Sequence, residues 1–225
     1  METNNTWDLL VSEDGSSTLL SNKFGVTYHS KHGALQESEH VFIKSGLDFI
    51  KTDKQELNIF EMGFGTGLNA YLSLLYALRN NLNIQYTSYE LHPLPRDLVK
   101  ELNYTDLLPE YANLFQLIHD IDWNKMQKLH PNFSINKVEE NILNFDYNDN
   151  FDVIFYDAFA PETQHELWET PIMEKMHEGL KSNGVLVTYC AKGEFKRTLK
   201  SIGFEVQSIP GPPGKREMTR AVKVL

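Results

Sequence analysis

Three alternating glycines form a turn that could hold a ligand against the backbone. Gly63, Gly65 and Gly67 stand between the apolar run "NIFEM" and the helix-like segment "LNAYLSLLYALR". Glycine lets the chain turn tightly and lets a ligand approach where a Cβ would clash. In open parallel sheets the first strand-to-helix turn is the usual nucleotide site. The pattern predicts a small-molecule site here, with an ordinary glycine-rich turn as the alternative.

The spacing of this turn separates cofactor classes. The dinucleotide fingerprint needs glycine at the first, third and sixth positions, but the sixth residue counted from Gly63 is Leu68. No Lys-Ser/Thr pair follows, which excludes a Walker-type phosphate loop. Glu61 stands two positions before the first glycine, and this arrangement resembles motif I of the class I S-adenosylmethionine methyltransferases. A carboxylate there suits a ligand with cationic sulfonium and ammonium groups.

The same resemblance indicates further cofactor contacts. We expect Phe64 and Thr66 to bind the cofactor together with the three glycines and Glu61. Glu90 ends the next apolar run, where a carboxylate can accept hydrogen bonds from both ribose hydroxyls; a merely solvated glutamate is the alternative. After the following strand, "VEENIL" places Glu140 and Asn141 where we expect the adenine edge.

A second carboxylate could act on an acceptor. The apolar run "FDVIFY" leads into Asp157, and residues 158–161 form a stiff turn that ends in Pro161. An amine acceptor must be desolvated, deprotonated and aimed at the methyl donor. Asp157 can accept its hydrogen bond and its proton beside the cofactor, and Phe159 and Pro161 can hold a planar base. The alternative is that Asp157 caps the following turn or helix.

Three motifs together point to one family. "EMGFGTGLN", "DAFAPETQHELW" and "GFEVQSIPGPPGKREM" resemble the methyltransferases that complete 5-methylaminomethyl-uridine at the tRNA wobble position. In some bacteria this activity is the N-terminal half of a bifunctional enzyme. The likeness extends from "VTYHSKHGALQESEHVFI" to the end of the chain. It implies methyl transfer from S-adenosylmethionine to the primary amine of 5-aminomethyl-(2-thio)uridine in the tRNA anticodon loop.

The resemblance also implies what lines the pocket and what is absent. "YHSKHGALQESEHVF" is expected at the cofactor pocket, with Tyr28, Gln36 and Glu37 as contacts, although packing is the commoner role for such residues. The bifunctional relatives continue into a flavin-dependent oxidase, whereas this chain ends at Leu225, so we expect no FAD. The family often has Gly-Asp where Glu140 and Asn141 stand.

The charge distribution allows a nucleic-acid partner. The net charge is −10, but residues 181–225 hold nine basic and three acidic side chains, so this segment is +6 and the remainder −16. Phosphate binding depends on Lys and Arg. We therefore expect tRNA contacts from this basic end, with a solvated helix face as the alternative. The candidates are Lys192, Lys196, Arg197, Lys215 and Arg216.

The elements that must position these residues alternate regularly. Short apolar runs separated by helical segments predict an α/β, Rossmann-like class I methyltransferase fold with a mostly parallel seven-stranded sheet. One of these helical segments is expected around residues 105–129. Residues 204–210 and 217–224 are joined by a short Gly/Pro loop, which predicts an antiparallel C-terminal hairpin. Before this core, residues 16–20 and 24–30 predict a small β-hairpin. We expect residues 1–50 to form an N-terminal β/helical extension packed on a Rossmann-like domain of residues 51–225.

The remaining features narrow the class of protein. No long apolar segment or signal peptide is evident, so we expect a cytoplasmic protein without membrane association. The histidines near the N-terminus follow no recognised metal-binding pattern, and no metal is expected. The single cysteine, Cys190, is interpreted as packing, and no obligate protein partner is deduced. The alternatives are a methyltransferase that acts on a small-molecule amine or another RNA, and a non-catalytic nucleotide- or RNA-binding scaffold.

Overall fold

The computed structural model describes residues 6–50 and 54–224, and within them the main sheet has eight strands in the order β10-β11-β9-β8-β4-β5-β7-β6. In chain order they are β4 (Glu56–Met62), β5 (Asn83–Glu90), β6 (Gln127–His130), β7 (Phe133–Glu139), β8 (Phe151–Tyr156), β9 (Leu180–Thr188), β10 (Phe204–Pro210) and β11 (Glu217–Lys223). β7, β5, β4, β8 and β9 run parallel, while β10 and β11 form the predicted antiparallel hairpin. The predicted α/β fold class is confirmed.

The strand count differs from the prediction by one. β6 pairs antiparallel with β7 within residues that the sequence pattern assigned to helix. Its side chains "QKLH" show no apolar alternation and none of them is fully buried, so the usual strand signal is missing. The expected single helix over 105–129 is instead divided into two shorter helices before this strand.

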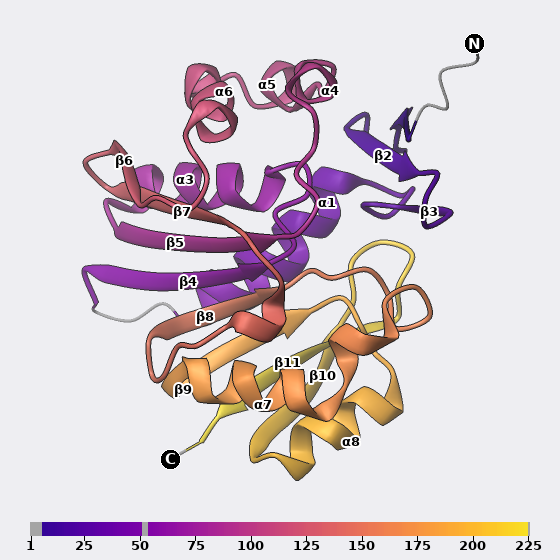
Figure 1. The fold of residues 1–225 in the computed structure, drawn as a ribbon, viewed down its shortest axis with the longest axis vertical. Coiled ribbons are helices and arrows are strands. Elements are labelled where there is room, and N and C mark those ends of the chain that lie inside the picture. The colour runs from indigo at the N-terminus through magenta and orange to yellow at the C-terminus, as the bar shows by residue number, and fades with distance from the viewer. Residues whose placement is uncertain (1–5, 51–53, 225) are drawn as a thin grey trace.

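Helices cover both faces of the sheet (Figure 1). They are α1 (Ala34–Ser38), the π-helix η1 (Glu39–Leu47), α2 (Asp48–Ile50), α3 (Leu68–Asn80), α4 (Arg96–Lys100), α5 (Tyr104–Leu107), α6 (Ala112–Asp120), the short 3-10 turns η2 (Ile142–Asn144) and η3 (His165–Trp168), α7 (Thr170–Gly179) and α8 (Gly193–Ser201). Strand residues alternate between two cores, as in β8, where Val153 and Phe155 pack with α3 and η1 but Ile154 and Tyr156 pack with α7 and α8. This two-sided burial explains why the strands read as continuous apolar runs.

The N-terminal segment forms a separate small sheet of β1 (Trp7–Val11), β2 (Ser17–Ser21) and β3 (Val26–Thr27). The predicted hairpin of 16–20 with 24–30 is only partly correct, because β2 pairs mainly with β1 and β3 is two residues long. Residues 34–50 form one continuous helical run that packs against α3, β8, β9 and β11. Its π-helical centre explains the imperfect α-helical spacing of the apolar residues.

The predicted division into 1–50 and 51–225 stays a prediction, and residues 51–53 lie outside the described residues. Among the described helices, none has the length and apolar character needed to cross a bilayer.

Candidate active site

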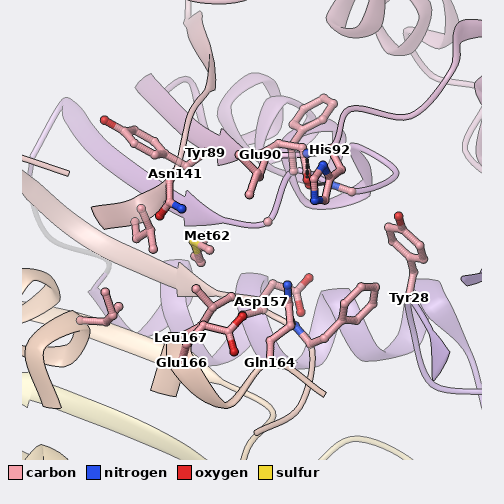
Figure 2. A pocket seen from close by; sticks show the side chains of 18 of the residues that line it. Tyr28, Met62, Tyr89, Glu90, His92, Asn141, Asp157, Gln164, Glu166 and Leu167 are labelled. Carbon is pink, nitrogen blue, oxygen red and sulfur yellow. Dashed lines mark hydrogen bonds between the residues drawn. The ribbon is translucent and has the colours of Figure 1, made fainter. Parts of the chain in front are cut away.

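A cavity of about 340 Å³ opens at the carboxyl ends of β4, β5 and β8 (Figure 2). It lies where Rossmann-like folds bind their ligands. Ten of the residues predicted for the site line it: Tyr28, Gly63, Phe64, Gly65, Thr66, Glu90, Glu140, Asn141, Asp157 and Phe159. These residues come from the N-terminal sheet and from four strand ends of the main sheet. Distant stretches of the sequence are thus brought to one site.

The glycine turn has no room for side chains. Gly63, Gly65 and Gly67 all have positive φ angles, of 90°, 49° and 73°. A Cβ on Gly63 would lie 2.9 Å from the Asp157 carbonyl oxygen, and one on Gly67 would lie 2.7 Å from His119 Nε2. The turn therefore forms a backbone-lined cradle directly beside the end of β8.

Glu90 connects β5 to this cradle. Its Oε2 accepts a hydrogen bond from Gly65 N at 3.1 Å, and its Oε1 accepts one from His92 N at 2.8 Å. A carboxylate has about four acceptor positions, so capacity remains for ligand hydroxyls. The predicted ribose contact is compatible with this geometry and stays a prediction.

Glu140 and Asn141 line the opposite side of the cavity, between β7 and η2. Asn141 Oδ1 accepts a hydrogen bond from Leu143 N at 2.9 Å, and Glu140 Oε1 accepts one from Asn144 Nδ2 at 2.7 Å. These bonds fix both side chains. The Asn141 amide nitrogen is left as a donor for a ligand edge.

Two acidic residues predicted to contact the cofactor lie behind the cavity wall. Glu61 is fully buried and its Oε2 accepts a 2.6 Å hydrogen bond from Ser88 Oγ. Burial raises the pKa of Glu61 to about 8. Glu37 is also buried, where it pairs with Lys215 at 2.8 Å. The residues that line the cavity do not include Glu61, Glu37, Gln36 or Gly67. Contacts between these four residues and a cofactor remain predictions.

Asp157 lies at the centre of the site. Its backbone N–H donates to Met62 O at 3.0 Å, and its Oδ2 accepts a 2.9 Å hydrogen bond from Asn69 Nδ2. Burial, together with the Glu37 and Glu61 carboxylates, raises the pKa of Asp157 well above its ordinary value, while Asn69 and Lys215 partly oppose this rise. The alternative cap is not formed, because the side chain's hydrogen bond in the described chain goes to Asn69 rather than to a helix end.

Phe159 belongs to an aromatic cluster at the mouth of the cavity. Its ring lies 5.3 Å from Phe24 and 5.1 Å from Tyr28, measured between centroids. Its backbone N–H donates to Gln164 Oε1 at 3.2 Å. Residues of the N-terminal segment thus help to hold the ring that was predicted to contact a base.

A second cavity of about 330 Å³ lies beside residues 160–162, which follow Phe159 of the first cavity. Pro161, Lys192, Lys215 and Arg216 line it, together with Tyr189. Lys215 Nζ lies 3.9 Å from the centre of the Tyr189 ring, and the Tyr189 hydroxyl donates to Ala158 O at 2.8 Å.

The predicted basic residues differ in how free their charges are. Lys192 pairs with Glu162, Lys196 with Glu217 at 2.8 Å, and Lys215 with Glu37. In the described part of the chain, Arg197 and Arg216 form no ion pair. Lys196 and Arg197 lie outside both cavities.

Sequence reasoning missed Asn69 and Phe24. Asn69 lies in the first turn of α3, two residues after the last glycine, and this position next to the turn was the available signal. Phe24 follows β2 in a loop, and nothing in the local pattern indicates that it reaches the main sheet. No cluster of His, Cys, Asp and Glu suited to a metal ion occurs within the described ranges.

Comparisons with known proteins agree with this geometry. The profile of a family described as S-adenosyl-L-methionine-dependent methyltransferase matches residues 100–224. The chain is 28% identical to the tRNA 5-methylaminomethyl-2-thiouridine biosynthesis bifunctional protein MnmC of Marinomonas sp. and 30% identical to that of Aromatoleum aromaticum. The alignments cover 92% and 94% of this chain but 32% and 34% of those proteins, so the chain spans about a third of their length.

A solved structure extends the likeness over the whole fold. The crystal structure of MNMC2 from Aquifex aeolicus superposes with a TM-score of 0.79 at 26% identity and covers 98% of this chain and 71% of that one. The glycine cradle, the carboxylate at the end of β5 and the family match lead to one assignment. The chain belongs to the S-adenosyl-L-methionine-dependent methyltransferase family.

Proposed function

We propose that this protein methylates the primary amine of 5-aminomethyl-(2-thio)uridine at the wobble position of tRNA, giving the 5-methylaminomethyl nucleoside. The observation that carries the proposal is the juxtaposition of Asp157 with the glycine cradle across one cavity. The names of the relatives supply the substrate class.

The residues present fit S-adenosylmethionine. Gly63 and Gly65 of the cradle present backbone to the cavity, Glu90 offers acceptor capacity for ribose hydroxyls, and Asn141 offers a donor for the adenine edge. When bound, this cofactor supplies a methyl group carried by a positively charged sulfur.

The chain's own residues act on the acceptor. Asp157 Oδ1 has no hydrogen-bond partner among the described residues and belongs to a side chain that lines the cavity. We assign it to accept a hydrogen bond from the amine and then the proton that nitrogen releases as its new N–C bond forms. The aromatic cluster of Phe159, Phe24 and Tyr28 excludes water and orients the base.

The second cavity suits the approach of the nucleotide. Residues 160–162, directly after the segment that carries Asp157, line it, and exposed Arg216 in its lining can contact a phosphate. We expect the anticodon loop to lie along this basic end, and the protein to act in the cytoplasm.

The test is methylation of tRNA purified from cells that lack this step. Nucleoside mass spectrometry should show conversion of 5-aminomethyl-(2-thio)uridine only when protein and S-adenosylmethionine are both present. The same tRNA with its wobble amine acetylated is the matched control and should stay unchanged. No conversion, despite cofactor binding measured by calorimetry, would favour a small-molecule amine, another RNA or a non-catalytic role.

A further inference from the structure

Asn69 links the glycine turn to the proposed catalytic carboxylate. It lies in the first turn of α3, is 4% exposed and contributes to the cavity lining. Its Nδ2 donates to Asp157 Oδ2 at 2.9 Å. A single buried amide thus joins the element that follows β4 to the end of β8.

This bond makes the two Asp157 oxygens unequal. Oδ2 is held by Asn69, whereas Oδ1 has no partner in the parts of the chain that the structure describes. The Asp157 backbone is already fixed by its bond to Met62 O. With the backbone and one oxygen both fixed, the carboxylate has one orientation in which it can meet an acceptor.

A buried acid lies behind Asn69. The polar neighbours of Glu61 are Ser88, Asn69 and Tyr86. Glu61 Oε1 and Asn69 Oδ1 are both acceptors buried without a hydrogen-bond partner, and the neighbouring Tyr86 hydroxyl is a third buried group without one. Two acceptors cannot bond to each other, but a carboxylic acid in place of the carboxylate turns one of them into a donor. One proton on Glu61 would therefore satisfy both of these acceptor oxygens, and Glu61 Oε2 already accepts from Ser88.

We propose that Asn69 is a positioning residue that holds Asp157 Oδ2 so that Oδ1 faces the acceptor amine, and that protonated Glu61 holds the Asn69 amide in this orientation. The assignment of the amine rests on the proposed function, whereas the hydrogen-bonded unit itself is independent of it.

The charged groups around Asp157 determine how the loss of Asn69 changes the pKa of Asp157. Glu37 on α1, Glu61 on β4 and Lys215 on the β10–β11 loop act on Asp157 electrostatically. Asp157 in turn acts on the hydroxyls of Tyr86 on β5 and of Tyr189, which follows β9. Asn69 stabilises the ionised carboxylate, as Lys215 does. Without the Asn69 amide, only Lys215 counteracts the effect of burial and of the two neighbouring carboxylates, so the pKa of Asp157 must rise.

The test is a carbon-13 NMR titration of the aspartate carboxyl groups, with the Asp157 signal identified by its loss in Asp157→Asn. Asn69→Ala should raise the Asp157 pKa by about one unit or more, because a hydrogen bond to a charged group contributes about 1.5–3 kcal/mol. Asn69→Asp keeps the shape, removes the donor and adds an acid, and should raise it further. Asn80→Ala is the matched control, since this exposed asparagine at the other end of α3 donates to Tyr76 O. An Asp157 titration unchanged in both Asn69 variants would overturn the proposal.

Kinetics give a second readout. For tRNA methylation, Asn69→Ala should lower kcat at pH 7 about tenfold or more and move the acid limb of the profile of kcat against pH to higher pH. The KM for tRNA should stay within about twofold of the wild-type value. A loss confined to cofactor affinity, with the limb unmoved, would contradict a positioning role. Wild-type protein that fails to methylate this tRNA would overturn the proposed function, while the NMR result would still decide the role of Asn69.

Discussion

The glycine-turn wall of the first cavity and the basic rim of the second are built in different ways. The wall consists of backbone with positive φ angles and of buried side chains such as Asn69, and buried Glu61 lies behind it. The rim consists of partly exposed cations, of which Lys192 and Lys215 already have carboxylate partners. The wall is thus preorganised before a ligand arrives. The paired cations of the rim must instead give up their carboxylate partners within the protein before they can contact a phosphate.

This difference separates two kinds of binding. A preorganised cradle loses little entropy on binding and tolerates almost no substitution. A paired surface cation gains little from a phosphate, because it gives up an existing ion pair to contact it. We therefore expect large, specific effects from changes at the wall and small, salt-dependent effects from changes at the rim.

The largest effect is expected where the two regions meet, at Asp157. Asp157→Asn keeps the shape of the side chain but removes the proton acceptor, so kcat for methyl transfer should fall by about 10²–10⁴-fold. Cofactor affinity measured by calorimetry should be unchanged. The control is Asp149→Asn, an exposed aspartate before β8 that pairs with Lys223. Normal turnover by Asp157→Asn would remove this carboxylate from the mechanism.

The next effect tests the rigidity of the wall. Gly63→Ala places a Cβ 2.9 Å from the Asp157 carbonyl oxygen at a φ of +90°, and should weaken S-adenosylmethionine binding by about 10–100-fold through roughly 1–3 kcal/mol of strain. Gly15→Ala is matched in φ, at +85°, but its Cβ would meet nothing within 4 Å. It should cost about 1–2 kcal/mol of stability and leave cofactor affinity intact. Similar cofactor affinities for the two variants would show that the cradle is not a tight fit.

A third prediction concerns the pH dependence of stability that results from Glu61, the buried acid behind the wall. The pKa of Glu61 is about 8 in the folded protein, against about 4.5 for an ordinary glutamate. Its stabilising contribution is therefore complete below about pH 4.5 and is lost as pH rises towards 8, by about 1.4 kcal/mol for each pH unit. Glu61→Gln mimics the protonated acid, so its unfolding free energy relative to wild type should increase steadily from pH 5 to pH 8.

Denaturant unfolding of both proteins at several pH values measures this difference. Buried groups that do not interact with Glu61 contribute equally to both proteins, including His29 and His119, whose lowered pKa values act in the opposite direction. If the difference in unfolding free energy between the two proteins did not change with pH, Glu61 would be ionised in the folded protein. It could then not donate the hydrogen bond that we propose it gives to the Asn69 amide.

The wall could be predicted from the sequence because its signals are local. Positive-φ glycines, apolar strands and strand-end acids occur within a few residues of one another, and parallel strands bring their ends to the same edge. The side-chain direction of Glu61 was harder to predict. It shares a strand face with buried Ile59, and this alternation, rather than the distance to the glycines, puts it behind the cavity.

The rim could not be predicted because its partners are distant in the chain. Glu37 and Lys215 are 178 positions apart, and Lys196 finds Glu217 only because β10 and β11 form a hairpin beside α8. A count of charges cannot show which are neutralised. Phe24 is a similar case, since the loop after β2 reaches the cavity only through tertiary packing.

The smallest predicted effect compares Arg216, at the rim, with Lys196 on α8, which lies outside the cavity. Arg216 is exposed and forms no ion pair among the described residues, whereas the Lys196 side chain is 13% exposed and pairs with Glu217. Arg216→Ala should weaken tRNA binding a few-fold and reduce the slope of log affinity against log salt by about one, the value for one lost phosphate contact. Lys196→Ala should change neither. Fluorescence anisotropy over a range of salt concentrations measures both. Equal losses of tRNA affinity in the two variants would mean that the internal ion pairs open when tRNA binds. The number of basic residues, rather than their pairing in the free protein, would then determine how tightly this surface binds tRNA.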